Sequence, residues 1–203
     1  MQFDEQPIIA AVRDEEGFHA ACDSPCHVIF LLNANIFSLP PYATEAHAKG
    51  KKVFLHVDLA EGVGKDACGI KFVQKCGVDG IITTRSSLIK QAKECGIACV
   101  QRFFMVDSHS VTTALDSIRS AAPDMIEIMP GTLGKTIRHL AACTSVPIIA
   151  GGMLETKEEI VSALSAGASA VSTGKRELWS LSKGEKYEKK DQYFYRPFSK
   201  AIR

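Results

Sequence analysis

The sequence predicts a single compact (β/α)8 barrel of the TIM type, an α/β fold, and three observations lead to this class. Eight short apolar runs rich in β-branched residues recur along the chain. Each run is followed by a segment with helical spacing or Ala-rich composition and then by Gly or Pro. The runs are apolar almost throughout, which indicates strands buried on both faces of a parallel sheet. Eight such units favour a closed barrel over an open doubly wound sheet.

The eight runs predict the strands in order along the chain. They read PIIAAV (7–12), VIFLL (28–32), VFLHV (53–57), GIIT (80–83), ACVQRF (98–103), MIEIM (125–129), PIIA (147–150) and ASAVS (168–172). Helix starts are indicated between them, for example at Ser108 and at Thr156. The second unit is the weakest, because Pro40 and Pro41 leave room only for a short helix before Gly50. A Rossmann-type open sheet is the alternative, but no G-x-G-x-x-G motif follows the first run.

The barrel is predicted to occupy residues 1–182, which is small beside the ~250 residues usual for this fold. We therefore expect short helices. Residues 183–203 lie beyond the last packed segment and carry seven Lys/Arg and three Asp/Glu, a net charge of +4. The whole chain has a net charge of +1, so residues 1–182 carry −3. We interpret the basic tail either as a cloning scar or as a flexible extension that touches nucleic acid.

Composition excludes several classes of protein. With 46% hydrophobic and 23% charged residues, the chain is neither disordered nor an integral membrane protein, and its apolar runs fall far short of the ~18 residues of a membrane span. The N-terminus is acidic where an export signal would be basic, so we expect a cytoplasmic protein. Seven cysteines without a CxxC motif or a His pair at zinc spacing indicate reduced thiols and no zinc site.

The segments after the seventh and eighth strands predict a phosphate site. In a barrel of this kind the working residues lie at the C-terminal ends of the strands. Gly151 and Gly152 allow the backbone to approach an anion closely, and the eighth run leads into a predicted helix whose N-terminus points to the same place. The alternative is that these glycines only form tight turns. The predicted phosphate-binding residues are Gly151, Gly152, Ser172, Thr173, Gly174 and Lys175.

Two carboxylates are predicted to lie near the barrel mouth. Asp58 and His56 project from the same strand face, and Glu127 comes from the sixth strand. The two carboxylates suit general acid–base chemistry, a metal site with Glu61, or acceptance of hydrogen bonds from substrate hydroxyls. The alternative is a structural network with Arg13 or Arg102. We interpret His56 as a hydrogen-bonded core histidine, and the lack of lysine within the runs argues against a Schiff-base aldolase.

Several segments, taken together, resemble the glycerol uptake operon antiterminator regulatory protein family. The resemblance runs from about Ile8 to Leu181 and rests on HVDLAEG (56–62), DGIITT (79–84), EIMPG (127–131), PIIAGG (147–152), AVSTG (170–174) and the closing Leu178-Trp179. It implies a barrel without a catalytic role, without a metal or cofactor, that senses glycerol 3-phosphate. When loaded, such a protein acts on the leader mRNA of glycerol-utilisation operons so that a terminator hairpin does not stop transcription.

The resemblance also implies roles for particular residues. The phosphate would bind at the two glycine loops, and Asp58 and Glu127 would accept the hydroxyls of the ligand. Because residues 1–182 carry a net charge of −3, direct RNA binding needs a local basic patch. The candidate RNA contacts are Lys49, Lys51, Lys52, Lys135 and Arg138. Their alternative interpretation is ordinary solvated helix surface. We expect the ligand to order the rim or to favour a homodimer that presents the RNA-binding surface.

Two other classes of function remain open from the sequence. The first is a barrel enzyme acting on a small phosphorylated substrate, such as an isomerase, lyase or phosphodiesterase, which would use Asp58 and Glu127 for proton transfer. In that case Asp58→Asn would abolish turnover and leave ligand affinity nearly intact, whereas a sensor would lose affinity. The second is a protein-interaction scaffold with a vestigial phosphate site, which would show neither RNA binding nor turnover.

Overall fold

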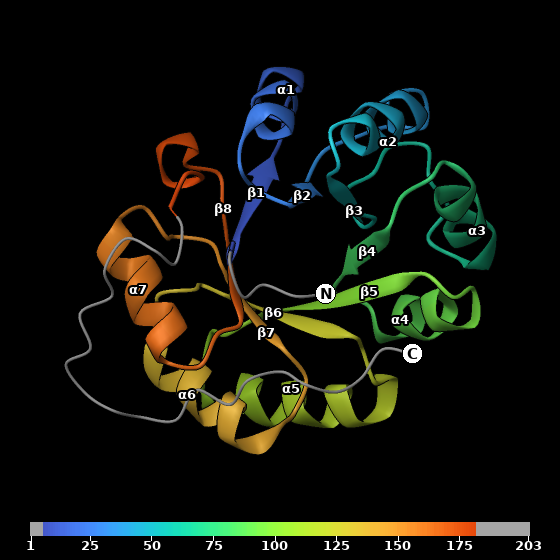
Figure 1. Ribbon diagram of the computed structural model, residues 1–203. Coiled ribbons are helices and arrows are strands. Elements are labelled where there is room, and N and C mark those ends of the chain that lie inside the picture. Colours follow the sequence, from blue (N-terminus) through green and yellow to red (C-terminus); the bar gives the residue numbers. More distant parts are fainter. Residues whose placement is uncertain (1–5, 182–203) are drawn as a thin grey trace.

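The computed structural model describes residues 6–181 as a closed barrel of eight parallel strands in chain order, and β8 pairs with β1 (Figure 1). This confirms the predicted fold class. The predicted basic tail, 183–203, lies outside the described residues. The strands are β1 (Ile8–Val12), β2 (Val28–Leu31), β3 (Lys52–His56), β4 (Gly80–Thr83), β5 (Ala98–Phe104), β6 (Met125–Met129), β7 (Ile148–Gly151) and β8 (Ala170–Thr173).

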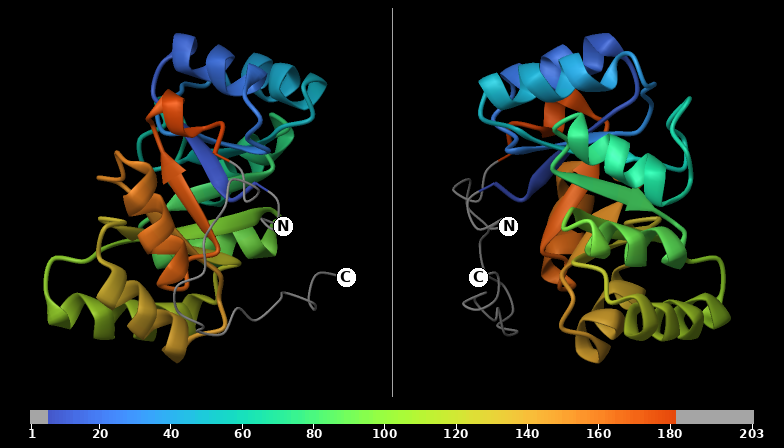
Figure 2. Two further views of the ribbon diagram at one scale, coloured as in Figure 1. Left: turned by 60° about the vertical axis from the view of Figure 1, so that its left-hand side comes forward. Right: turned by 90° about the vertical axis from the view of Figure 1, so that its right-hand side faces the viewer.

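Seven α-helices follow the first seven strands and lie outside them (Figures 1 and 2). Four of them begin after an Asp or Thr whose side chain accepts a hydrogen bond from the first turn, as Thr156 does before the seventh helix. The predicted start at Ser108 lies one residue after the cap, which is Asp107. The helices are α1 (Glu15–Asp23), α2 (Leu39–Ala48), α3 (Ala67–Lys75), α4 (Ser86–Glu94), α5 (Ser108–Ala121), α6 (Gly134–Cys143) and α7 (Lys157–Ser165).

The structure differs from the prediction in the second and eighth units. Helix α2 has ten residues, as many as α6, because its two prolines lie in the first turn, where no backbone N–H donor is needed. After β8 the predicted α-helix is replaced by a 3-10 helix of three residues, η1 (Arg176–Leu178). The reason is that Leu178 and Trp179 are already buried there, and Trp179 Nε1 donates a hydrogen bond to the Thr173 carbonyl at 2.8 Å. Up to Leu181, the last residue described, no α-helix N-terminus follows β8.

The core has two layers, one inside the barrel and one between strands and helices. Inside, Phe54 from β3 lies against Gly80 of β4, where an added Cβ would come within 2.2 Å of its ring. The interior residues are Ile9, Val28, Phe30, Phe54, Ile82, Val100, Met125, Ile149 and Ala170. This apolar filling stops short of the C-terminal ends of the strands, where polar side chains take over. Among residues 6–181, none of the helices has the length and apolar character needed to cross a membrane.

Candidate ligand-binding site at the barrel mouth

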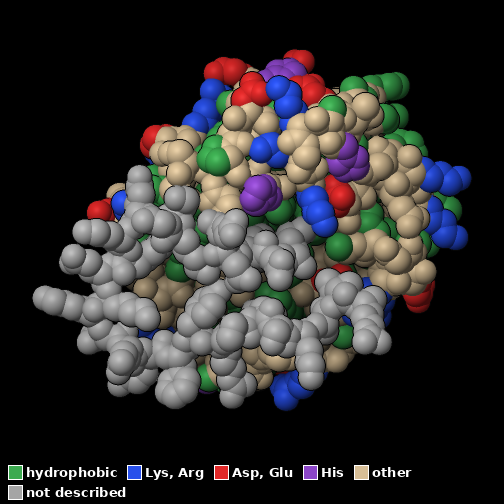
Figure 3. Space-filling model, viewed as in Figure 1, with side chains coloured by type: hydrophobic (Ala, Val, Ile, Leu, Met, Phe, Trp, Pro, Cys, Tyr) green, Lys and Arg blue, Asp and Glu red, His purple; other side chains and the backbone are tan. Residues whose placement is uncertain are grey.

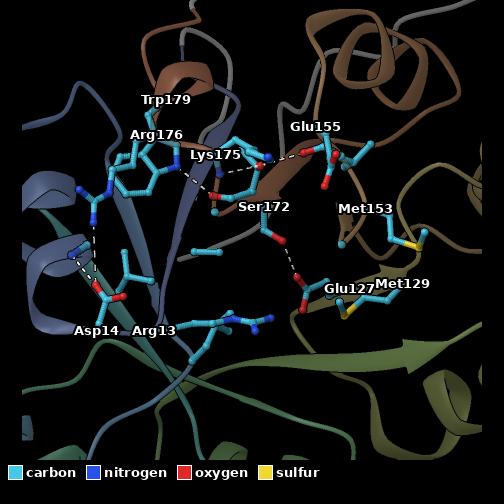
Figure 4. Close-up of a pocket in the computed structure, with 18 of the residues that line it drawn as sticks. Arg13, Asp14, Glu127, Met129, Met153, Glu155, Ser172, Lys175, Arg176 and Trp179 are labelled. Carbon is cyan, nitrogen blue, oxygen red and sulfur yellow. Dashed lines mark hydrogen bonds and ion pairs between the residues drawn. The ribbon is translucent and has the colours of Figure 1, made fainter.

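A cavity of about 380 Å³ lies at the C-terminal end of the barrel, bounded by the segments that follow β1, β7 and β8 (Figure 4). Five of the six predicted phosphate-binding residues line it. Its lining consists of Ala11, Val12, Arg13, Asp14, Gly17, Leu32, Arg102, Glu127, Met129, Gly152, Met153, Leu154, Glu155, Ser172, Thr173, Gly174, Lys175, Arg176 and Trp179. The barrel topology thus brings together residues more than 160 positions apart in the chain.

The loops after β7 and β8 are tied to one another and to the wall beneath them. Thr173 Oγ1 donates a hydrogen bond to the Leu154 carbonyl at 3.0 Å and accepts one from the Lys175 N–H at 3.2 Å. Gly152 has a φ of +73°, and a Cβ there would lie 2.6 Å from the Met129 methyl carbon. Only glycine fits this position without strain, so the glycine does more than form a turn.

Gly151, the sixth predicted residue, is absent from the cavity lining and lies against the buried polar group below it. A Cβ at Gly151 would come within 2.4 Å of Glu127 Oε1 and 2.6 Å of Ser172 Oγ. This close approach brings the loop backbone onto the carboxylate of Glu127. The absence of a side chain is therefore required for packing at this position.

Glu127 is the centre of a buried hydrogen-bond network on the cavity floor. Its side chain is 1% exposed, Ser172 Oγ donates to its Oε1 at 2.6 Å, and Arg102 Nε donates to its Oε2 at 2.6 Å. Figure 4 shows Ser172 and Glu127 pointing toward one another across the cavity. For Glu127, the alternative interpretation given by the sequence, a structural network with Arg102, is therefore confirmed. Arg102 lines the cavity as well, so the ion pair that holds the floor together also faces the cavity.

The cations at the rim differ in how far they are neutralised. Arg176 donates to Glu16 at 2.6 Å and lies 3.9 Å from Asp14, so its charge is already compensated. Arg13 and Lys175 are exposed, and neither the Arg13 guanidinium nor the Lys175 ammonium group has a hydrogen-bond or ion-pair partner in the described part of the chain. These two side chains are therefore free to bind an anion that enters the cavity.

Asp58 does not join Glu127 in this cavity. Its oxygens accept hydrogen bonds from Thr83 Oγ1 at 2.8 Å and from the N–H and hydroxyl of Thr84 at 2.8 and 3.0 Å, and Arg85 Nε lies 3.6 Å away. Burial opposes ionisation, but the hydrogen bonds from Thr84 and Thr83 hold the pKa of Asp58 below its ordinary value. The carboxylate links the loop after β3 to the loop after β4, a role that strand spacing alone does not reveal.

His56 is buried as expected, but it is not the hydrogen-bonded core histidine that we predicted. It is 5% exposed, and neither ring nitrogen has a hydrogen-bond partner among residues 6–181. Burial, followed by the positive charge of Arg102, lowers its pKa to about 4. The imidazole is therefore neutral at pH 7 and contributes no charge to the floor of the mouth.

The five candidate RNA contacts fall at two ends of the barrel. Lys49 donates to Asp23 at 2.9 Å, Lys51 donates to the Ser24 carbonyl, and Lys52 begins β3, so these three lie at the N-terminal end of the strands. Lys135 and Arg138 lie on α6, whose first turn is on the side of the mouth, and both are exposed. The structure does not bring the two groups together.

Sequence reasoning missed several residues of the cavity. Asp14 caps α1 and Arg176 lies in η1, and both line the mouth although nothing in their local sequence indicates it. Met153 has a φ of +58°, which is rare for a residue with a side chain, and is 72% exposed at the rim. The sequence carried one usable signal, since Met153 directly follows the paired glycines. Within residues 6–181, no group of three His, Cys, Asp or Glu side chains is arranged to hold a metal ion.

A family model and two solved structures point to the same family. The sequence model of the family described as glycerol-3-phosphate responsive antiterminator matches residues 8–179. The crystal structure of a glycerol uptake operon antiterminator regulatory protein from Listeria monocytogenes is 32% identical with a TM-score of 0.84, covering 88% of this chain and 97% of that one. A glycerol uptake operon antiterminator-related protein from Thermotoga maritima is 34% identical with a TM-score of 0.79, covering 87% and 99%. The Escherichia coli protein YgcP, described as uncharacterized, is 36% identical over 180 residues, covering 88% of this chain and 94% of YgcP.

Proposed function

Because the chain belongs to the glycerol-3-phosphate responsive antiterminator family, we propose that it is a metabolite-gated regulator of transcription. It binds glycerol 3-phosphate in the mouth cavity and, when loaded, acts on the leader mRNA of a glycerol uptake operon so that transcription continues past a terminator. It works in the cytoplasm and has no catalytic role. The observation that carries the ligand assignment is the cavity itself, which combines an uncompensated pair of cations with a glycine loop.

The phosphate group is assigned to the side of the cavity formed by the loops after β7 and β8. Gly152 and Gly174 let the backbone approach an anion, and Lys175 and Arg13 supply positive charge. Between β8 and residue 181 the structure has η1 in place of the expected α-helix, so this assignment rests on the two cations and the glycines and makes no use of a helix dipole. Ser172 and Thr173 contribute to the wall, but both hydroxyls already donate hydrogen bonds within the protein.

The hydroxyl groups are assigned to the floor of the cavity. Glu127 accepts two hydrogen bonds from protein donors and has further acceptor capacity, because an ionised carboxylate offers about four lone-pair positions. Asp58 would have to release Thr83 or Thr84 before it could accept a ligand hydroxyl. We therefore assign the hydroxyl contact to Glu127 first and keep Asp58 as the secondary candidate.

The ligand can act as a gate because it contacts side chains from three separate strands and the segments that follow them. A molecule bound to Lys175, Arg13 and Glu127 connects the ends of β1, β6 and β8. If RNA binds the connected form better, the ligand increases RNA affinity, and RNA must increase ligand affinity by the same factor. The ligand-bound form that binds RNA is either a monomer with an ordered rim or a homodimer.

Direct RNA binding requires a local surface, because the charge of the barrel is not uniformly positive. On the face seen in Figure 3, Lys and Arg side chains lie scattered among Asp and Glu side chains. Lys135 and Arg138 lie on α6, which begins on the side of the mouth. The other three lysines, Lys49, Lys51 and Lys52, lie at the opposite end of the barrel, so a ligand in the cavity is less able to affect them. We expect charge reversal at Lys135 to weaken RNA binding more than charge reversal at Lys52.

Two titrations test the proposal. Calorimetric titration with glycerol 3-phosphate should give saturable binding, whereas glycerol and inorganic phosphate, each offering half of the contacts, should bind much more weakly. Fluorescently labelled leader RNA is then titrated with protein at one fixed salt concentration, with and without saturating ligand, since phosphate contacts make RNA affinity strongly salt-dependent. Equal RNA binding in both arms, or no binding of glycerol 3-phosphate, would contradict the proposed function.

A further inference from the structure

A second cavity, of about 310 Å³, lies beside the mouth cavity and is lined mainly by residues with polar or charged side chains. It is enclosed by the segments that follow β1, β2 and β3, and it shares Arg13 and Asp14 with the first cavity. The residues that line it are Arg13, Asp14, Asn33, Ala34, Asn35, Ser38, Tyr42 and Glu61. The ligand assigned above does not fill this space, and its exposed polar groups are accessible to a second molecule.

The polar groups of this second cavity are both donors and acceptors of hydrogen bonds. The Asn33 amide, the Glu61 carboxylate and the Tyr42 hydroxyl have no partner in the part of the chain that the structure describes. Tyr42 is held by stacking on Phe18, with ring centroids 4.2 Å apart and an angle of 22° between planes. A carboxylate beside amide and hydroxyl groups suits a neutral group that carries its own N–H donors and carbonyl acceptors, and the edge of a nucleobase has this pattern.

An exposed aromatic ring is attached to the same loop. Phe37 is 83% exposed, although burial of a phenylalanine is strongly favourable. Its backbone is fixed, because Asn35 Oδ1 accepts hydrogen bonds from the N–H groups of Phe37 and Ser38, both at 2.9 Å. The loop is further paired with the next one, since the Ile36 N–H donates to the Glu61 carbonyl at 3.2 Å. The ring is therefore presented to solvent by an ordered loop.

Together these features match the requirements of single-stranded RNA binding. Proteins that bind unpaired nucleotides combine an aromatic face for stacking, polar groups for the base edge and a cation for the backbone phosphate. Phe37 supplies the face, Glu61 and Asn33 the polar groups, and Arg13 the cation. The buried core of a protein–protein interface consists mainly of aromatic and aliphatic side chains, whereas this cavity is lined by one alanine and seven polar or charged residues.

We propose that the second cavity binds one unpaired nucleotide of the RNA, with its base held by Glu61 and Asn33, its ring system next to Phe37 and its phosphate at Arg13. This proposal rests on the proposed function and locates the RNA on the rim of the mouth. Arg13 faces both cavities, and its guanidinium has five N–H donors, so it can hold the ligand phosphate and an RNA phosphate together. That shared contact couples the two binding events.

The test measures the affinity of labelled leader RNA by fluorescence anisotropy at saturating glycerol 3-phosphate and fixed salt. We expect Phe37→Ala and Glu61→Gln each to raise the RNA Kd about fivefold to hundredfold, the range for loss of one stacked base or one base-edge contact. The matched controls are Phe72→Ala, an exposed phenylalanine on α3, and Glu94→Gln at the end of α4, which should leave the Kd within about twofold. Glycerol 3-phosphate affinity, measured calorimetrically without RNA, should be unchanged in Phe37→Ala.

A second readout separates affinity from coupling. Phe37→Ala should weaken RNA binding and keep the ratio of RNA affinities with and without ligand, whereas Arg13→Ala should reduce that ratio toward one. If wild-type RNA binding depends on the ligand but both Phe37→Ala and Glu61→Gln behave like their controls, the nucleotide site is refuted and the proposed function stands. If the wild type binds no RNA in either arm, the proposed function itself fails. If Phe37→Ala changes only the sedimentation coefficient of the protein and leaves its RNA affinity unaltered, Phe37 belongs to a protein–protein interface, and the nucleotide site is overturned.

Discussion

Replacing Glu127 by Gln tests the energetic role of the buried network with little change in shape. The amide can turn its oxygen toward Arg102 Nε and its NH2 group toward the Ser172 hydroxyl, so both hydrogen bonds of the network can be kept. What disappears is the negative charge beside a guanidinium whose side chain is 8% exposed. Removing one partner of a buried ion pair costs about 3–5 kcal/mol, and because the hydrogen bonds survive we expect the lower end, about 3 kcal/mol.

The assay for Glu127→Gln is urea unfolding, supported by thermal unfolding. A loss of about 3 kcal/mol lowers the melting temperature of a domain of this size by roughly 6–12 °C. The matched control is Asp116→Asn, which breaks the Arg119–Asp116 pair, with a similar N–O distance of 2.7 Å but with side chains 73% and 68% exposed. That control should cost less than about 1 kcal/mol.

Two results would refute the reasoning about Glu127. The first is a variant within about 0.5 kcal/mol of the wild type, which would mean that water in the mouth cavity already solvates Arg102. The second is additivity in the double variant, Glu127→Gln with Arg102→Met. If its loss of unfolding free energy equals the sum of the losses in the two single variants, the residues are not coupled, because a coupled pair loses less than that sum. Glycerol 3-phosphate should stabilise Glu127→Gln less than the wild type, because the amide offers the ligand hydroxyls a weaker acceptor than the carboxylate does.

Three further predictions follow from the same geometry. Lys175→Ala should weaken glycerol 3-phosphate binding about tenfold or more in calorimetry, because a charge-assisted hydrogen bond to phosphate is lost. The pKa of His56 is lowered to about 4 in the folded state and is near 6.5 in the unfolded chain, so the unfolded state takes up the proton first. The free energy of unfolding should therefore fall as pH drops from about 6.5 to about 4, by at most about 3 kcal/mol, and this slope should be missing in His56→Leu. A thiol reagent at pH 8 should label the exposed Cys68 and Cys143 first and reach Cys99 only on unfolding, since burial raises the pKa of Cys99 to about 12.

Two of these three predictions have a control variant in the same chain. Lys90→Ala, at an exposed position on α4, should leave ligand affinity unchanged, and equal losses in both variants would point to general electrostatics. His27→Leu, at an exposed histidine, should retain the acid slope of the wild type, and an unaltered slope in His56→Leu would assign it to other groups. Fast labelling of Cys99 in the folded protein, followed by mass spectrometry, would contradict the burial that the structure assigns to it.

Much of the fold was predictable because strand patterning is local. The runs at 80–83 and 125–129 coincide with β4 and β6, since each is an apolar segment bounded by turn residues. The eighth unit was mispredicted for a reason that local sequence does not contain. Trp179 becomes buried by donating to Thr173 and by accepting a hydrogen bond from Gln6 at the other end of the chain, and this shortens the last helix to η1.

The sequence alone determined the number and order of the strands, the end of the barrel at which polar side chains gather and the family to which the chain is similar, because all three depend on short patterns of residues. Tertiary structure decided which of those side chains meet. Register between β5 and β6 sets Arg102 opposite Glu127, whereas Thr83 and Thr84 take the oxygens of Asp58 away from the cavity. Strand spacing shows the face on which a carboxylate lies, but its hydrogen-bond partners come from neighbouring strands and loops, which the register of the folded sheet brings within reach.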